Sequence, residues 1–438
     1  MLDIKLIREN PDVVRANLEK RHDPAKLELL DQVVDADKQW RELTAKVNRL
    51  RKRRNQVSSE IANVLKQGKD VSELKEEAKR IPDEIKALEV ELSQKQEIVR
   101  NGLMRLPNLL HESVPYGRDD KDNVVIKIFG EPPKFSFTPS SHADLASKLG
   151  IIDMDRAAKV SGTGFYYLLN EMALLDYAIM RYAIDHLINK GYALIEPPYM
   201  IHRSYYEGVT DLSDFENVMY RIDDSENVKD PLYLIATSEH AMGAMLKDEV
   251  INEDALPIKL CGISPCFRRE IGSHGKYTKG IFRVHQFNKV EQFIFSTPGK
   301  SWGLHEELQR NCEELYSMLG LVFRVVNVCT GDIGSIAAKK YDTEIWMADG
   351  EFREVGSNSN CTDYQARRLN IRYRHKEGQA PAGFVHTLNN TALATSRTMI
   401  AVIEQYQQED GSVIIPKVLR PYMNGMERME GKLNKLKI

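Results

Sequence analysis

The sequence lacks any run of about 18 uncharged apolar residues, the length that a membrane-spanning helix needs. Its first ten residues, MLDIKLIREN, carry acidic charge, and no apolar stretch of signal-peptide length follows them. Hydrophobic residues make up 42% of the chain and charged residues 29%, which is too apolar for a disordered chain and too polar for a membrane-embedded one. We therefore expect a soluble, cytoplasmic protein with no membrane partner.

Paired cysteines and a strong net charge are also missing. The five cysteines form no C-x-x-C pair, so we expect reduced thiols, most of them in the core, and no zinc. The 61 basic and 64 acidic side chains give a formal net charge of −3. The whole-chain sum does not indicate a nucleic-acid binder, but it can hide one basic segment. A length of 438 residues predicts two or three domains.

A heptad pattern begins at Leu29, where apolar residues recur at alternating spacings of four and three. It stops at a turn signal at residues 67–70 and resumes from Val71 to Val99. This pattern predicts two helices of about 30 residues, folded into an antiparallel coiled-coil hairpin roughly 45 Å long. Pro82 lies inside the second helical pattern, where we expect a kink and not an end.

The first of these helices is basic. Residues 36–66 contain nine Lys or Arg and three Asp or Glu, a local net charge of +6. Five cations lie within six positions: Arg49, Arg51, Lys52, Arg53 and Arg54. Such charges commonly form a solvated coiled-coil face, but cations without interleaved acids also fit a polyanionic partner. The cluster alone leaves both interpretations open.

A Pro-, Asp- and Asn-rich stretch follows Leu106 and predicts a linker between domains. After it, helical and strand-like segments alternate to the end of the chain. The predicted helices are Glu171–Lys190, Trp302–Leu319 and Thr391–Gln407. The predicted strands are Val124–Phe129, Pro231–Ala236, Ile258–Arg269, Ile281–Phe295, Phe323–Cys329 and Ala382–Leu388. Long strands joined mainly by loops favour an α+β domain, in which helices flank an antiparallel sheet.

The segment from Cys266 to Phe293 is rich in groups that bind nucleotides. Two strand-like runs flank a basic, glycine-bounded loop at residues 272–280, which lacks the setting of a P-loop. With a period of two, Arg268 and Glu270 share one face of the first strand. Arg283, Phe287 and Glu291 share one face of the second. Such a set can grip phosphates, stack a base and hold an ammonium group, although a ladder of cross-strand ion pairs is the structural alternative.

Three further stretches carry polar groups in suggestive places. Thr237 and Glu239 follow a strand and could cap a helix. Glu354 and Ser357 could supply oxygen ligands to Mg²⁺. Arg397 falls near the start of the helix predicted from Thr391, where a cation gains nothing from the helix dipole and suggests a bound anion.

Together these segments resemble the seryl-tRNA synthetases, which have the class II aminoacyl-tRNA synthetase architecture. The shared stretches follow one order along nearly the whole chain: MLDIKLIRENPDVVRANLEKR, the helical arm, GIIDMDRAAKVSGTGFYYLL, TSEHAM, FRRE, HQFNKVEQF, NVCTGDIG, HTLNNTALATSRT and VLRPYMNG. The resemblance implies an N-terminal tRNA-binding domain at 1–110, with an arm at about 28–101, and a catalytic domain at 111–438. Pro198 in IEPPYM matches a proline of the family's dimer interface, which implies a homodimer.

The implied activity is ATP-dependent attachment of serine to serine tRNA through a seryl-adenylate, with selenocysteine tRNA as an open question. The residues implied for ATP are Arg268, Arg269, Glu270, Arg283, Val284, Phe287, Glu354, Val355, Gly356, Ser357 and Arg397. Those implied for serine are Thr237, Glu239, Arg268, Glu291, Asn389 and Thr391. Arg268 and Arg397 would act on the phosphates, and Glu354 and Ser357 would hold Mg²⁺. No side chain is required as a nucleophile.

The five arm cations, Arg49, Arg51, Lys52, Arg53 and Arg54, would bind the long variable arm of serine tRNA. The chain departs from many family members, which have Ser at the positions of Thr391 and Gly356 and Ser or Lys at that of Arg269. The main alternative is a synthetase-like paralogue with a non-charging or regulatory role. The intact arm argues against a carrier-protein ligase, and the complete set of Arg268, Glu270, Glu291 and Arg397 argues against an inactive regulator.

Two further interpretations have less support. The zinc-dependent type of seryl-tRNA synthetase needs cysteine ligands and a different N-terminal domain, which this sequence does not show. A coiled-coil interaction protein with an incidental α+β domain would have no ATP-dependent chemistry.

Overall fold

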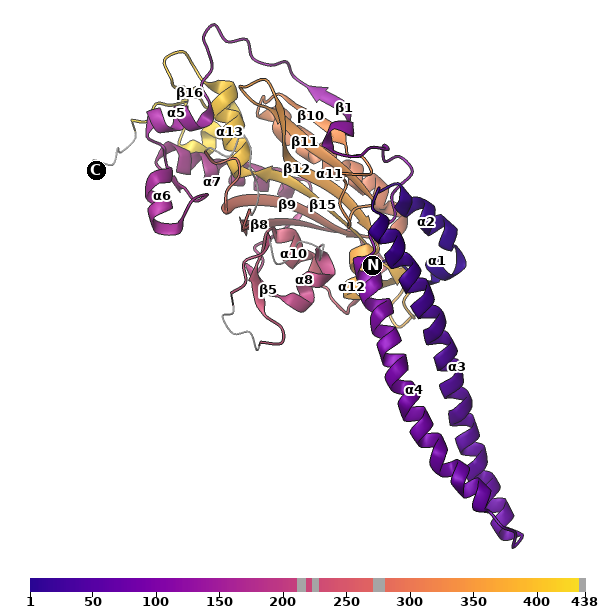
Figure 1. Ribbon diagram of the computed structural model, residues 1–438. Helices are drawn as coiled ribbons and strands as arrows, with labels where there is room; N and C mark the ends of the chain where they lie inside the picture. Colours follow the sequence, from indigo (N-terminus) through magenta and orange to yellow (C-terminus); the bar gives the residue numbers. More distant parts are fainter. Residues whose placement is uncertain (211–217, 223–227, 271–279, 433–438) are drawn as a thin grey trace. The chain divides into compact units, whose positions relative to one another are not determined.

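The computed structural model describes residues 1–210, 218–222, 228–270 and 280–432 (Figure 1). The basic loop expected at residues 272–280 therefore lies, apart from Gly280, outside the described residues. The chain forms two compact units, Met1–Leu109 and Leu110–Ile438. No helix among the described residues combines the length and the apolarity that crossing a bilayer requires.

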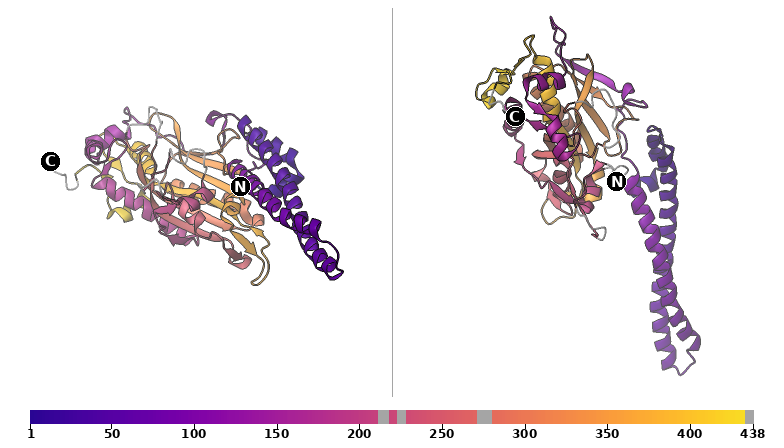
Figure 2. Two further views of the ribbon diagram at one scale, coloured as in Figure 1. Left: turned by 60° about the horizontal axis from the view of Figure 1, so that its bottom comes forward. Right: turned by 60° about the vertical axis from the view of Figure 1, so that its left-hand side comes forward.

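The first unit is helical, and two long helices dominate it (Figure 2). Its helices are α1 (Ile4–Glu9), α2 (Pro11–Glu19), α3 (Pro24–Lys66) and α4 (Ser72–Arg105). α3 starts five residues before the heptad pattern because Asp23 caps it, accepting a hydrogen bond from the Ala25 amide, and Pro24 fits the first helical position. The turn between α3 and α4 lies where the sequence predicts it, with the Asp70 carboxylate accepting from the Ser72 amide at 3.0 Å.

The two long helices pack antiparallel, as the heptad pattern predicts. Val47 and Val57 of α3 are buried against Ile81, Ile85 and Leu88 of α4. Ion pairs Lys46–Glu84 and Arg53–Glu77 join the helices with opposite chain directions. α4 continues across Pro82, so the helix does not end there. At 43 and 34 residues, the helices are longer than the 30 expected.

The second unit is built on an eight-stranded sheet of order β1-β10-β11-β12-β15-β9-β8-β4 (Figure 1). All neighbours in this sheet are antiparallel except β4 and β8. The strands in this order are β1 (Val124–Phe129), β10 (Phe323–Asn327), β11 (Lys339–Trp346), β12 (Phe352–Thr362), β15 (His386–Ala394), β9 (Gln286–Ser296), β8 (Ile258–Phe267) and β4 (Ala193–Ile195). The predicted α+β class with a mainly antiparallel sheet is confirmed.

Helices and short strands surround this sheet. The described helices are α5 (His142–Leu149), α6 (Met154–Ser161), α7 (Glu171–Asn189), α8 (Arg203–Val209), α10 (Ser238–Ala244), α11 (Ser301–Met318), α12 (Tyr364–Leu369) and α13 (Thr395–Tyr406). The short strands are β2 (Ile152–Asp153), β3 (Tyr167–Leu168), β5 (Met200–His202), β6 (Leu232–Leu234), β7 (Val250–Asn252), β13 (Arg372–Arg374), β14 (Gly383–Phe384), β16 (Val413–Ile414) and β17 (Arg428–Met429).

Strand β9 shows how the sheet separates its core from its open face. Asn288 donates to Asp176 of α7, and Gln292 donates to the Leu308 carbonyl of α11, so these even-numbered residues face the covering helices. Side chains alternate along a strand, and the odd-numbered residues of β9 therefore face the opposite side. The sequence of β9 thus places one polar set in the core and another on the face that is left for ligands.

Two of the sequence-based element predictions need correction. The helix expected from Thr391 begins at Thr395, because Asn389, Asn390 and Thr391 continue strand β15 and pair with Phe293, Gln292 and Glu291 of β9. Arg268, Glu270 and Arg283 were expected on strands. They instead lie beyond the end of β8 or before the start of β9, and Glu270 has a positive φ of 46°.

The five cysteines are all free and buried.

Candidate active site

A cavity of about 230 Å³ opens on the face of the sheet formed by β9, β12 and β15. Its lining gathers almost every residue that the sequence predicts for ATP or serine. The lining residues are Thr237, Glu239, Arg268, Glu270, Phe282, Arg283, Val284, Phe287, Lys289, Glu291, Glu354, Val355, Gly356, Ser357, Asn389, Thr391, Ala394, Ser396 and Arg397. Within the described residues, Arg269 is not part of this lining, and its amide donates to the Val218 carbonyl.

One end of the cavity carries two carboxylates. Glu291 on β9 is 1% exposed at its side chain, and its Oε2 lies 2.6 Å from Lys289 Nζ and accepts from Thr391 Oγ1 at 3.2 Å. Glu239, at the start of α10, accepts from Asn389 Nδ2 at 3.1 Å. This end therefore offers acidic groups held in place by neutral donors and one lysine, which suits a small molecule with an ammonium and a hydroxyl group.

The Glu239 carboxyl has a raised pKa. Burial raises the pKa of Glu239 to about 7, and the nearby Glu291 adds to the rise, while Lys289 opposes it. Gln365 on α12 donates to the same Glu239 oxygen at 3.2 Å. Since Gln365 also donates to Val209 and accepts from Thr387, its amide is fixed and orients Glu239.

Thr237 has the structural role that the sequence allows and also faces the cavity. Its Oγ1 accepts from the Glu239 amide at 3.2 Å as the N-cap of α10. The capping interpretation is thus correct, and it explains how the chain turns from β6 toward the cavity with Glu239 in place. Thr237 therefore both caps α10 and helps to place Glu239 in the cavity.

The other end of the cavity carries arginines and aromatic rings. The Arg268 guanidinium carbon lies 5.2 Å from the centre of the Phe287 ring, and Arg268 Nε donates to the Ala236 carbonyl at 3.4 Å. Arg283 Nη1 lies 2.7 Å from Glu270 Oε2. A flat ring beside a guanidinium can stack an aromatic base while the cation meets its phosphates. This arrangement suits a nucleoside triphosphate.

Arg397 is the third residue of α13 and reaches across to β12. It donates to the Glu354 carbonyl at 2.6 Å, and its guanidinium carbon lies 4.7 Å from the centre of the Phe282 ring. Burial lowers the pKa of Arg397, and Glu354 opposes this change, yet a guanidinium stays charged at neutral pH. A half-buried cation near other arginines indicates a binding site for an anion.

Oxygen donors cluster where β11 and β12 run side by side. Glu354 opens onto the cavity with its side chain 48% exposed, and it accepts from Ser357 Oγ at 3.3 Å. Burial would raise the pKa of Glu354, but Arg397, Lys340 and Arg268 outweigh it and lower the pKa below its usual value. Asp342 on β11 pairs with Ser357 across the strands, is buried, and has a pKa raised by burial. Its Oδ1 has no hydrogen-bond partner among the described residues.

The sequence analysis missed several members of this site. Lys289 shares the alternation of Phe287 and Glu291, so the period of two in β9 could have identified it. Asp342 and Gln365 lie far from the motifs in the sequence, and only the pairing of β11 with β12 and the packing of α12 bring them in. No local pattern indicates them.

Gly356 and Thr391 are neighbours in the site. A Cβ atom on Gly356 would lie 2.8 Å from Thr391 Cβ, which is closer than Cβ atoms approach other atoms, and 3.1 Å from Thr391 Cγ2, which is a tight contact. Glycine therefore lets the strand that carries Glu354 and Ser357 approach the strand that carries Thr391. Two of the three departures noted in the sequence, Gly356 and Thr391, are thus in contact with each other.

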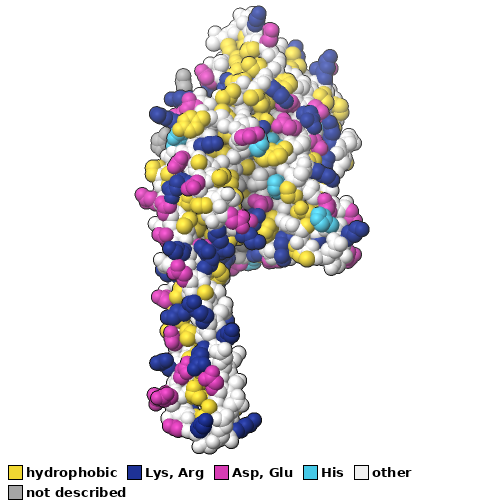
Figure 3. Space-filling model, turned by 90° about the vertical axis from the view of Figure 1, so that its right-hand side faces the viewer, with side chains coloured by type: hydrophobic (Ala, Val, Ile, Leu, Met, Phe, Trp, Pro, Cys, Tyr) yellow, Lys and Arg dark blue, Asp and Glu magenta, His cyan; other side chains and the backbone are white. Residues whose placement is uncertain are grey.

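The five arm cations belong to the first unit. Arg51 pairs with Glu89 at 2.8 Å, and Arg53 pairs with Glu77 and Glu60, so part of the cluster forms the ordinary ion pairs of a coiled coil. Arg49, Lys52 and Arg54 are exposed, and none of them has an ion pair with a residue in the described part of this unit. Figure 3 shows Lys and Arg side chains along the hairpin with Asp and Glu side chains among them.

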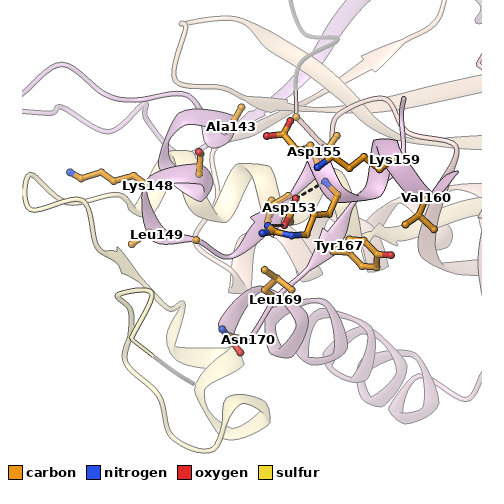
Figure 4. A pocket seen from close by; sticks show the side chains of 16 residues that line it. Ala143, Lys148, Leu149, Asp153, Asp155, Lys159, Val160, Tyr167, Leu169 and Asn170 are labelled. Atoms are coloured by element: carbon orange, nitrogen blue, oxygen red, sulfur yellow. Dashed lines mark hydrogen bonds and ion pairs between the residues drawn. The ribbon is translucent and has the colours of Figure 1, made fainter. Parts of the chain in front are cut away.

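A larger cavity of about 840 Å³ lies elsewhere in the second unit, between α5, α6 and the short strands β2 and β3 (Figure 4). None of the predicted site residues lines it. Its charges are mixed, with Arg156 Nη1 2.6 Å from Asp153 Oδ2. The smaller cavity, with its convergent charges and perturbed pKa values, is therefore the candidate active site.

Comparisons with known proteins agree on one family. A family model described as "Seryl-tRNA synthetase N-terminal domain" matches residues 1–110, and "tRNA synthetase class II core domain (G, H, P, S and T)" matches residues 220–406. A serine–tRNA ligase from Methanocorpusculum labreanum is 56% identical over 428 residues, 98% of this chain and 100% of that one.

Two solved structures are similar over their whole length. Seryl-tRNA synthetase from Pyrococcus horikoshii, complexed with ATP, has a TM-score of 0.94 and 47% identity and covers 98% of this chain and 99% of its own. Cytoplasmic serine-tRNA ligase from Naegleria fowleri, in complex with AMP, has a TM-score of 0.89 and 34% identity, with 99% of both chains covered.

Proposed function

This chain belongs to the seryl-tRNA synthetase family and attaches serine to tRNA with ATP, and we propose that serine is activated in the cavity on the face of β9, β12 and β15. The observation that supports this location is the meeting of two sets of groups. Arginines and aromatic rings at one end suit a nucleotide, and paired carboxylates with a threonine hydroxyl at the other suit serine. Catalysis then consists mainly of holding both substrates with their reacting atoms together.

The reaction has two steps. A serine carboxylate oxygen attacks the α-phosphorus of ATP, the bond from that phosphorus to the β-phosphate oxygen breaks, and pyrophosphate leaves. A ribose hydroxyl at the end of the tRNA then attacks the carbonyl carbon of seryl-adenylate, and AMP leaves. The protein supplies positioning and positive charge, since neither step needs a side-chain nucleophile.

The nucleotide end has distinct roles for its residues. Phe287 stacks the adenine, Glu270 approaches its edge, and Val284 and Val355 line the same space. Arg268 binds the α-phosphate, where charge develops. Arg397 binds the γ-phosphate, and Arg283 reaches the phosphates from its contact with Glu270.

The serine end explains how alanine is rejected. Glu239 and Glu291 hold the ammonium and hydroxyl groups of serine, with the Thr391 hydroxyl already hydrogen-bonded to Glu291. Alanine would leave these buried polar groups without a partner, which lowers its transition-state binding by several kcal/mol, on the order of 10⁴-fold. Asn389 contributes by holding Glu239 at 3.1 Å.

Mg²⁺ fits the oxygen cluster on β11 and β12. Glu354 and Ser357 would hold the ion, and the buried Asp342 Oδ1, which has no hydrogen-bond partner among the described residues, is a further donor. Oxygen donors of this type are those that Mg²⁺ prefers. Held there with ATP, the ion would supply positive charge that neutralises the phosphates.

The helical hairpin of the first unit is where we place the tRNA. Arg49, Lys52 and Arg54 are exposed and available for phosphates, whereas Arg51 and Arg53 already pair with acids. Long variable arms of serine tRNAs would be recognised by shape and backbone more than by base sequence. The enzyme would act in the cytoplasm as a homodimer, with Pro198 in its interface and one subunit's hairpin serving the other subunit's cavity.

Serine-dependent exchange of labelled pyrophosphate into ATP tests the proposal. We expect exchange with serine and little with threonine, alanine or glycine, and loss of exchange in Arg268→Ala. Lys376→Ala, at an exposed position that is not among the residues lining the cavity, serves as the matched control with unchanged exchange. Absence of exchange with serine, or equal exchange with alanine, would contradict the proposed activity.

A further inference from the structure

Lys289 is a buried cation of the cavity for which the reaction described above has no role. It lies on β9 between Phe287 and Glu291, and all three side chains line the cavity. Residues two apart on a strand are about 6.8 Å apart along it. Lys289 therefore sits midway between the ring that stacks the base and the acid that holds serine, which is where the α-phosphate and the serine carboxylate must meet.

The side chain of Lys289 is buried to an extent that is unusual for a lysine with a single ion pair. Its side chain is 6% exposed, and its ammonium lies 2.6 Å from the Glu291 carboxylate. Lysine is rarely buried to this extent unless it is paired, and a single pair uses only one of its three donors well. Lys289 lines the same cavity as Glu239, and it lowers the pKa of that carboxyl.

The charge balance changes when serine enters. In the empty cavity, Lys289 is the cation shared by Glu239 and Glu291. The serine ammonium supplies a second cation to the same two acids, so the lysine is no longer needed there. Its four-carbon stem is flexible, and the next group on the same face of β9 is Phe287, beside Arg268 at 5.2 Å.

We propose that Lys289 is a further catalytic residue, whose ammonium moves from the Glu291 carboxylate to an α-phosphate oxygen when serine binds. This inference rests on the proposed function of the cavity. In this step the new bond joins a serine carboxylate oxygen to the α-phosphorus, the bond to pyrophosphate breaks, and the lysine ammonium neutralises the added charge. Arg268 and Lys289 then hold the reacting phosphate from two sides.

A purely neutralising lysine would behave differently. If Lys289 only balances the two acids, its loss should be harmless once Glu291 is neutral and the serine ammonium balances Glu239. The comparison therefore uses Glu291→Gln and the double variant Lys289→Met/Glu291→Gln, which contains neither charge. The quantities compared are the maximal rate of serine-dependent pyrophosphate exchange and the serine dissociation constant without ATP.

The proposal predicts that the double variant exchanges pyrophosphate about 10²-fold more slowly than Glu291→Gln at saturating serine, with a similar serine dissociation constant. Equal rates would overturn it. Lys289→Arg, which keeps the charge, should recover part of the rate, and thermal unfolding of each variant checks that it folds.

A binding measurement extends the test to variants that are too slow to assay. With saturating serine, Lys289→Met should bind AMP at least tenfold more weakly than the unmodified protein does, while its affinity for adenosine, which has no phosphate, stays the same. An unchanged ratio of the two affinities would also overturn the proposal. If the unmodified protein itself shows no serine-dependent exchange, the proposed function fails first, and the two failures are thus distinguishable.

Discussion

Glu239 should make serine binding depend on pH. Burial raises the pKa of this carboxyl to about 7, so in the empty cavity it is largely protonated below pH 7 and largely ionised above it. A serine ammonium binds the ionised form. Below pH 7, serine must therefore expel a proton to bind, and each further pH unit costs about 1.4 kcal/mol, a factor of ten in affinity.

The size of the effect follows from that pKa. The ionised fraction of Glu239 is about nine-tenths at pH 8 and about one-tenth at pH 6, so the serine dissociation constant should rise about tenfold between these pH values. Burial lowers the pKa of the neighbouring His240 to about 3, which keeps it neutral over this range and removes it as a competing cause. The direction is unambiguous: serine binds more weakly in acid.

Titration calorimetry in two buffers of different ionisation enthalpy measures the linked proton directly. At pH 6.5, about three-quarters of a proton should be released per serine bound, and near pH 8.5 almost none. Glu239→Gln should bind serine weakly, with no pH dependence and no proton release. A serine affinity that is flat from pH 6 to 8 in the unmodified protein, with no proton released, would refute the role given to Glu239.

Three other variants test the hairpin, the Gly356–Thr391 contact and the Phe287 ring separately. Removal of residues 36–100, whose ends are adjacent because Gly102 packs against Val33, should leave pyrophosphate exchange nearly intact and abolish tRNA charging; equal loss of both would show that the hairpin has another role. Gly356→Ala places a Cβ 2.8 Å from Thr391 Cβ and should raise the KM for serine at least tenfold, an effect that exchange kinetics would measure and that an unchanged KM would disprove. Phe287→Ala should weaken ATP binding by about 1–3 kcal/mol with little change in serine affinity, and ATP titration monitored by fluorescence would reveal the opposite pattern if the ring held serine instead.

Periodic patterns predicted the parts of the fold that depend on local sequence. The heptads gave the antiparallel hairpin and its turn because apolar spacing alone decides which faces of α3 and α4 meet. The helix expected at Thr391 was wrong because polar residues that usually start a helix are here paired in β15 with Glu291 and its neighbours. Tertiary pairing outweighed local preference at that point.

The site was predictable to the extent that it is carried by motifs. Phe287 and Glu291 share a strand face as expected, and Lys289 obeys the same alternation although it was not proposed. Arg268, Glu270 and Arg283 line the cavity, as predicted. They do so from segments outside β8 and β9, however, and not from the strand faces on which the prediction had placed them. Asp342 and Gln365 could not be found, since their contacts depend on sheet order and helix packing.

The central claim is that one cavity holds serine and the nucleotide together. A crystal structure with a non-hydrolysable seryl-adenylate analogue tests it most directly. We expect the adenine on Phe287, the linking group beside Arg268, and the serine hydroxyl and ammonium groups between Glu239, Glu291 and Thr391. An analogue bound in the larger cavity between α5 and α6, or bound with its serine end away from these acids, would contradict it.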